Sequence, residues 1–395
     1  MQKATRQHTK DHNTRLVLRT LFQQDDISRA DIARATGLTR PTVSSIIADL
    51  LKAGLAIETG IGPSAGGKPP ILLRVNADAH HILSIDLGSR NFRVALINLR
   101  GDIIRQLEEP SDGRQGENAL ALAFQMTDGL LEGQVTPIIG VGIGTPGVVD
   151  PVRGVVQNAV NLGWSALPIR ERFAARYGLP VHIANDCHAA ALAEYLYGGP
   201  RASDNLILIK VSRGIGAGII LEGRPFYGDG FGAGEIGHLV VNPQGTRCSC
   251  GNIGCLETIA STQAILTQAR AMAEVSSSSM LSYAASDASQ VAWDDVVAAF
   301  RAGDEETTQL MTEIGRYLGV ALADLIATLN VHTLIISGRI SQFGDDLLDA
   351  ARAEARHRAY PKMVDETDIR FSSLGPEIVL LGCTTLVLKE ELGVV

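Results

Sequence analysis

Four side chains that can bind a metal ion gather in the middle of this 395-residue chain. They are His238, Cys248, Cys250 and Cys255, within the run EIGHLVVNPQGTRCSCGNIGCLE (235–257). Residues two apart in an extended segment point to the same side, so Cys248 and Cys250 can face one ion. Glycines at 251 and 254 permit the tight turn that returns Cys255 to the same point. Three thiolates and one imidazole form a closed tetrahedral set, which is typical of a structural Zn²⁺ site.

Two other interpretations of these cysteines are buried structural thiols and a disulfide. The polar N-terminus, MQKATRQHTKDHN, has no apolar signal core, so we expect a cytoplasmic protein with reduced thiols. We also expect no membrane insertion, since no run of about 18 apolar residues occurs. Zn²⁺ is therefore favoured over both alternatives, and the remaining two cysteines, Cys187 and Cys383, are expected to be buried and inert.

The N-terminal segment has the pattern of a helix-turn-helix. Ser28 can cap one helix and Gly37 can end it, and Thr39 can cap the helix RPTVSSIIADLLKAGL. A second helix that begins with small polar residues is typical of a motif that reads the major groove of DNA. The side chains expected near bases or phosphates are Arg40, Thr42, Ser44 and Ser45.

Two short strands, LAIETG and PPILLRVN, flank a glycine-rich segment that would form a wing, with Lys68 near the DNA backbone. Residues 1–75 carry 11 Lys/Arg and 6 Asp/Glu, a net charge of +5, whereas the remainder carries 24 and 37, a net of −13. A basic head on an acidic body favours a polyanionic partner for the head. A small helical bundle or a protein-binding module is the alternative for residues 1–75.

A polar connecting segment lies at residues 76–81. The alternating strands and helices that follow it predict an α/β body over residues 76–395. The strand LPVHIAND runs into an alanine-rich helix, which places Asn185 and Asp186 at a strand end facing a cleft. A simple pair of helix-capping residues is the other interpretation. Near the C-terminus, IVLLGCTTLVL is predicted to be a strand that passes into a helix.

The run E-I-G-H, nine residues, C-x-C-G-x-x-G-C-x-E resembles the signature of the ROK family, which comprises repressors and sugar kinases. The N-terminal segment also resembles the winged domains of ROK repressors. The resemblance implies a two-lobed, actin-like sugar-kinase fold after a winged helix-turn-helix, and a zinc that shapes a sugar-binding loop. It implies sugar contacts from Glu235, His238 and Glu257, and we add Asn161, Asn185 and Asp186 to this set. In ROK kinases the aspartate that matches Asp186 is the general base.

The glycine-rich loops that hold ATP in ROK kinases differ in this chain. A first loop of approximately D-x-G-G-T-K is here DLGSRN (86–91), so arginine and asparagine replace threonine and lysine. A second, G-T-G-x-G-x-G, is here SRGIGAG (212–218), and a G-G-G turn is here SGR (337–339). Arginine can bind phosphate, so each change alone is ambiguous. Together they predict that productive ATP binding is lost and that Asp186 is a vestigial base.

We therefore expect a sugar-responsive transcriptional regulator, a repressor of carbohydrate genes that a sugar or sugar phosphate releases from its operator. Its partners would be double-stranded DNA, the effector and further copies of itself, as a dimer or tetramer. The alternatives are an active sugar kinase with an added DNA-binding head, and a repressor controlled by a protein partner.

Overall fold

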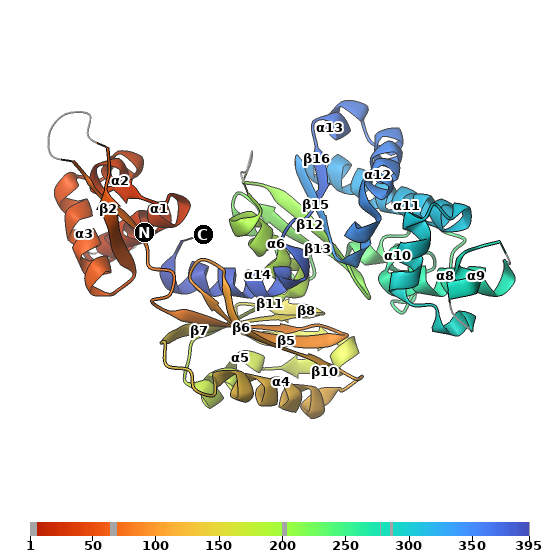
Figure 1. The fold of residues 1–395 in the computed structure, drawn as a ribbon, viewed down its shortest axis with the longest axis horizontal. Coiled ribbons are helices and arrows are strands. Elements are labelled where there is room, and N and C mark those ends of the chain that lie inside the picture. The colour runs from red at the N-terminus through yellow and green to blue at the C-terminus, as the bar shows by residue number, and fades with distance from the viewer. Residues whose placement is uncertain (1–5, 64–68, 200–203, 277, 285–286, 395) are drawn as a thin grey trace. The chain divides into compact units, whose positions relative to one another are not determined.

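The computed structural model describes residues 6–63, 69–199, 204–276, 278–284 and 287–394 (Figure 1). The chain divides into two compact units. Unit 1 comprises Met1–Asp186 with Leu380–Val395, and unit 2 comprises Cys187–Val379. Among the described residues, no helix has the length and apolar character needed to cross a membrane.

Unit 1 begins with a head of three helices and a small antiparallel sheet. Its elements are α1 (Arg6–Gln23), β1 (Ile27–Ser28), α2 (Arg29–Thr36), α3 (Arg40–Lys52), β2 (Ala56–Ile61) and β3 (Ile71–Val75), with the strands in the order β1-β3-β2. The Ser28 hydroxyl accepts a hydrogen bond from the Asp31 amide at 3.2 Å, and Thr39 caps α3 through the Thr42 amide at 3.4 Å. Gly37 ends α2 at a φ of 69°. Both predicted caps are therefore confirmed.

The rest of unit 1 is a lobe built on a five-stranded sheet of order β11-β7-β4-β5-β6. Its strands are β4 (His81–Leu87), β5 (Asn91–Asn98), β6 (Ile103–Pro110), β7 (Ile138–Thr145) and β11 (Val181–Asn185). A second sheet, of order β10-β9-β8, contains β8 (Val148–Asp150), β9 (Val155–Ala159) and β10 (Trp164–Leu167), with the 3₁₀ turn η1 (Val160–Leu162) between the last two.

Helices cover both faces of the five-stranded sheet. On one face lie α4 (Gly116–Leu131) and α5 (Ile169–Tyr177), whose apolar residues join those of β4, β5 and β7 in one buried core (Figure 1). On the other lies α14 (Ile378–Val387), where Leu380 packs on Ala95 and Ile97. The chain ends after a π-helical turn, η6 (Leu388–Leu392).

The predicted strand at the start of IVLLGCTTLVL is wrong, because residues 378–387 are helical throughout. The helix is apolar on all sides, so its sequence lacks the one-sided pattern that separates a helix from a buried strand. A Cβ atom at Gly142 of β7 would lie 2.1 Å from the Cys383 carbonyl oxygen, so only glycine lets this helix approach the sheet.

Unit 2 holds a second five-stranded sheet, of order β14-β13-β12-β15-β16. Its strands are β12 (Leu206–Val211), β13 (Ile215–Leu221), β14 (Arg224–Pro225), β15 (Thr333–Ser337) and β16 (Asp368–Phe371). Helix α6 (Asp186–Tyr197) packs closely on β13, since a Cβ at Gly218 would lie 2.1 Å from the Cys187 carbonyl oxygen.

The remaining helices of unit 2 form the other part of its core. The longest is α11, whose buried stripe includes Leu318, Leu322 and Ile326 and joins residues of β12 and β15 in one apolar cluster. The helices and turns are η2 (Ile236–His238), α7 (Glu257–Ala260), α8 (Thr262–Val275), α9 (Leu281–Ala284), η3 (Ala288–Gln290), α10 (Trp293–Arg301), α11 (Glu305–Leu329), η4 (Arg339–Phe343), α12 (Gly344–Arg358), α13 (Pro361–Asp365) and η5 (Gly375–Glu377).

Candidate metal centre and sugar-binding site

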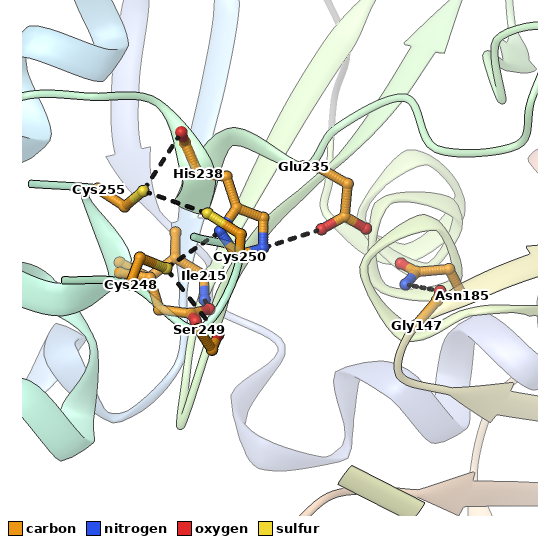
Figure 2. A network of polar contacts seen from close by, with 10 residues as sticks. Gly147, Asn185, Ile215, Glu235, His238, Cys248, Ser249, Cys250 and Cys255 are labelled. Carbon is orange, nitrogen blue, oxygen red and sulfur yellow. Dashed lines mark hydrogen bonds and ion pairs between the residues drawn. The ribbon is translucent and has the colours of Figure 1, made fainter. Parts of the chain in front are cut away.

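The predicted metal ligands His238, Cys248, Cys250 and Cys255 converge on one point of unit 2 (Figure 2). Their ligand atoms all lie within 4.8 Å of one another. The Sγ atoms of Cys250 and Cys255 are 3.7 Å apart, and Nδ1 of His238 is 3.5 Å from Cys248 Sγ. Sulfur atoms placed tetrahedrally at about 2.3 Å from one zinc ion are about 3.8 Å apart. The cluster can therefore hold a metal ion with little movement.

A folded-back loop brings the cysteines together. The Cys248 amide donates to the Asn252 carbonyl at 2.8 Å, and the Gly251 amide donates to the Cys248 carbonyl at 3.0 Å. Gly254 has a φ of 75°, and a Cβ there would lie 1.5 Å from the Asn242 carbonyl oxygen. Glycine is therefore required at this turn, and the turn places Cys255 beside the other ligands.

The thiols experience different surroundings. Burial raises the pKa of the Cys255 thiol to about 12, and a backbone hydrogen bond with Asn252 lowers the pKa of the exposed Cys250 thiol. A metal ligand must be a thiolate, so a bound cation has to offset the cost of ionising Cys255. Three sulfurs and one nitrogen are the donors that Zn²⁺ accepts in closed structural sites. The residues therefore fit this ion.

His238 presents its two ring nitrogens to different surroundings. Nδ1 faces the thiol cluster, whereas Nε2 lies 3.9 Å from a carboxylate oxygen of Glu235 (Figure 2). The side chains of His238 and Glu235 keep 34% and 46% of their surface exposed, so both can be reached by a ligand. A histidine held through one nitrogen leaves the other free to act toward a hydroxyl group.

Glu257 links the cysteine loop to the glycine-rich turn between β12 and β13. It follows Cys255 by two residues, and its Oε2 accepts a hydrogen bond from the Ile215 amide at 3.0 Å. A Cβ at Gly214 would lie 2.6 Å from the same oxygen. Glu257 therefore holds this turn through a hydrogen bond, in addition to the sugar contact that the family resemblance implies.

The other predicted sugar residues, Asn161, Asn185 and Asp186, lie in unit 1. Asn185 ends β11 and donates from Nδ2 to the Gly147 carbonyl at 2.9 Å, and Asp186 starts α6 with 8% of its surface exposed. Asn161 is exposed in η1. The bond from Asn185 joins the strand end to the GTPG loop at 144–147. Glu235, His238 and Glu257 lie in unit 2, and the sugar contacts of all six residues remain a prediction.

Helix α3 presents the predicted DNA-reading residues on its outer side. Arg40, Ser44 and Ser45 are exposed and Thr42 is half-buried, whereas the opposite stripe, Val43, Ile46, Ile47 and Leu50, is buried. Lys68 lies outside the described residues. The exposed polar face can therefore enter a groove, and the DNA contacts remain a prediction.

At the glycine-rich loops the structure adds Arg93, which the sequence patterns did not single out, and it shows the partners of Arg339. Arg93 on β5 is paired with Asp86 on β4 and binds its buried carboxylate at 2.8 Å. Arg339 stacks on Trp293 with its guanidinium carbon 5.4 Å from the ring centre, and binds Asp294 at 2.5 Å. The Asp86–Arg93 pair depends on strand register, for which the single sequence offers no signal.

Comparison with known proteins agrees with this architecture. The sequence model of the ROK family matches residues 82–390, and that of a winged helix-turn-helix DNA-binding domain matches residues 10–56. The xylose repressor of Caldicellulosiruptor bescii is 33% identical over 97% of both chains. A glucokinase of Halalkalibacterium halodurans is 31% identical over 78% of this chain and 95% of that protein.

The solved structure of a ROK family transcriptional regulator, a homologue of the E. coli MLC protein, covers 98% of both chains with a TM-score of 0.85 and 30% identity. The predicted fold, a winged helix-turn-helix followed by a sugar-kinase-like α/β body, is thereby confirmed. Because the family match spans most of the sequence and the relatives align end to end, this chain is a member of the ROK family.

Proposed function

We propose that this chain is a sugar-responsive transcriptional repressor, with a DNA-binding domain at residues 1–75 and a sugar-binding and dimerisation domain at 76–395. One observation carries the proposal. The exposed Glu235 lies beside the half-buried His238, which belongs to a metal-ligand cluster, in a chain that also has a capped helix-turn-helix. The end-to-end relative named a xylose repressor supports the same function.

In the head, α3 would lie in the major groove. Arg40 stands at the first turn of α3, where an exposed guanidinium can reach a phosphate or a guanine edge. A homodimer would place two such helices on half-sites about 34 Å, or a multiple, apart. The body is acidic, so the basic head supplies the attraction to DNA.

In the body, Glu235, His238 and Glu257 would face the hydroxyls of a sugar, since carboxylates accept from hydroxyls and an imidazole nitrogen can donate or accept. Cys248, Cys250, Cys255 and His238 Nδ1 would hold Zn²⁺, which when bound supplies a fixed cross-link within the loop. His238 then has a single ring orientation, with Nε2 beside Glu235. Sugar binding would favour one arrangement of the body and so change the operator affinity, typically by ~1–3 kcal/mol.

Phosphoryl transfer is not part of this proposal. A nucleotide brings Mg²⁺, which needs a carboxylate ligand in addition to the phosphate oxygens. The carboxylate next to the first glycine-rich loop, Asp86, is buried against Arg93. The arginine of the third loop, Arg339, is held by Trp293 and Asp294. Both arginines support loss of the nucleotide site, although a glucokinase is among the relatives.

A thermal-shift screen of the full chain tests the sugar side. D-xylose and D-glucose come first, followed by other pentoses, hexoses and their phosphates. A ligand at about 100 times its dissociation constant stabilises the folded state by ~2.7 kcal/mol. The proposal requires stabilisation by at least one sugar, and loss of that stabilisation in E235A. A shift that persists in E235A would place the effector elsewhere, and no shift with any sugar would favour control by a protein partner.

A further inference from the structure

One arginine of the unit 1 lobe reaches the head of the same unit. Arg100, in the turn between β5 and β6, donates from Nη1 to the Phe22 carbonyl at 2.7 Å and from Nη2 to the Leu21 carbonyl at 3.2 Å. It also pairs with Asp25 and lies over the Phe22 ring, with 5.5 Å between its guanidinium carbon and the ring centre. The last turn of α1 has carbonyls without helical partners, and a cation is favourable there.

The turn that carries Arg100 is itself fixed. The Asn98 side-chain oxygen accepts from the Arg100 and Asp102 amides, both at 3.0 Å. Its Nδ2 donates to the Asp78 carboxylate at 2.8 Å, and the buried Leu99 donates its amide to the Ala77 carbonyl at 2.9 Å. The turn and the segment that joins the head to the lobe therefore form one hydrogen-bonded unit.

The joining segment is also hydrogen-bonded to the residues that follow α3. The Asn76 amide donates to the Leu55 carbonyl at 3.0 Å, and its side chain donates to the Gly54 carbonyl at 2.9 Å. Gly54 and Leu55 follow Ala53, the C-cap residue of α3. Arg100 thus holds the end of α1 and Asn76 holds the residues that follow α3. We call residues 76–78 together with 98–102 the joint.

The strands that leave the joint lead to the first glycine-rich loop. β4 and β5 are paired along their whole length, from His81↔Asn98 at the joint to Leu87↔Phe92 next to residues 88–90. Near the loop, the half-buried Arg93 binds the buried carboxylate of Asp86 and so links the two strands. Asn98 of the joint lies five residue steps after Arg93 along β5, which in a strand is about 17 Å. β4 is also paired with β7, and the predicted sugar residue Asn185 is bonded to Gly147 just beyond the end of β7. A displacement caused by sugar binding at Asn185 can therefore reach the joint through β7 and β4.

We propose that Arg100 is a positioning residue that holds the DNA-binding head in a fixed orientation on the lobe and thereby couples effector binding to operator affinity. This inference rests on the proposed function for its coupling part. Arg100 itself contacts no residue that is predicted to bind sugar, metal or DNA. Its loss should therefore not weaken the binding of sugar or of DNA directly.

The test compares full-length wild type with R100A, R100K and the control R105A. Arg105 lies on β6, shortly after the turn that carries Arg100, but it donates to the Glu132 carbonyl in the lobe. DNA affinity is measured on a duplex selected by the wild type from a random library, with and without D-xylose or the sugar found in the thermal-shift screen. Amide hydrogen exchange of residues 18–26 and 76–80 is followed without ligands. Arg15 of α1 also lies close to Gly393, since a Cβ there would be 2.5 Å from its Cδ, and R100A is expected to keep this contact.

We expect R100A to bind sugar within about twofold of wild type, while the sugar changes its DNA affinity less than about twofold, against about 5–150-fold in the wild type. R100K should be intermediate, because an ammonium cannot bond both carbonyls as a planar fork does. Exchange should be faster in both segments in R100A and unchanged in R105A. An R100A protein with wild-type coupling and wild-type exchange would overturn the inference. If the wild type shows no coupling, the proposed function fails, and the exchange data alone then decide whether Arg100 holds the head.

Discussion

Replacement of Cys250 by serine tests the metal centre most cleanly, because this ligand is exposed. Its neighbours Cys248 and Cys255 are buried, and substitutions there would also disturb packing. An exposed change away from special features alters the free energy of unfolding by about 0.5 kcal/mol at most. Any larger effect of C250S must therefore come from a lost metal ligand.

The size of the effect follows from binding linkage. A metal present at about 1,000 times its dissociation constant stabilises the folded protein by about 4.1 kcal/mol. For a unit of about 150–250 residues, each kcal/mol shifts the unfolding midpoint by about 2–4 °C. Complete loss of binding in C250S should therefore lower the midpoint of the unit 2 transition by about 8–16 °C.

The assay is thermal unfolding combined with elemental analysis of the purified protein. Wild type should contain one zinc per chain, C250S close to none, and a chelator should lower the wild-type midpoint to that of C250S. The neighbouring substitution S249A is the control, since Ser249 is exposed and contributes no ligand. A C250S protein with full zinc content and an unshifted midpoint would refute the tetrahedral assignment.

Further expectations concern the two binding surfaces. R40A should weaken operator binding and reduce the salt slope by about 1, with sugar affinity unchanged; equal DNA affinity in a gel-shift titration would remove Arg40 from the reading surface. E257A should weaken sugar binding and loosen residues 214–215, since a hydrogen bond from an amide to a charged group contributes about 1.5–3 kcal/mol. E257Q retains an acceptor for the Ile215 amide and should lose less sugar affinity than E257A. Equal sugar affinities of the two variants by calorimetry would show that the bond to Ile215 is unimportant. H238A should lose both zinc and the sugar response, and a variant that keeps its zinc would contradict the role of Nδ1.

Local signals in the sequence were sufficient for the elements that define the site. The caps at Ser28 and Thr39 depend on residues three apart, and the cysteine loop depends on glycines within the same short segment. Both partners of such an interaction lie within a few residues of each other, so the interaction can be predicted from spacing alone. The metal-ligand cluster was found for the same reason.

The features that were missed depend on how the segments pack together, not on spacing within one segment. Helix α14 was mistaken in part for a strand because it is buried on both sides and lacks periodicity. The pairs Asp86–Arg93 and Arg100–Phe22 arise from strand register and from the placement of the head on the lobe. No spacing rule predicts these pairs, since many other arginines in the sequence could have formed similar contacts.

The most direct measurement is the affinity of the wild-type chain for its selected operator duplex, with and without sugar, on protein also assayed for ADP formation. We predict a change in the dissociation constant of about 5–150-fold with at least one sugar, and no sugar-dependent ADP above background. Sugar-dependent ADP formation at about 1–100 s⁻¹, with operator affinity unaffected by sugar, would contradict the account and identify a kinase.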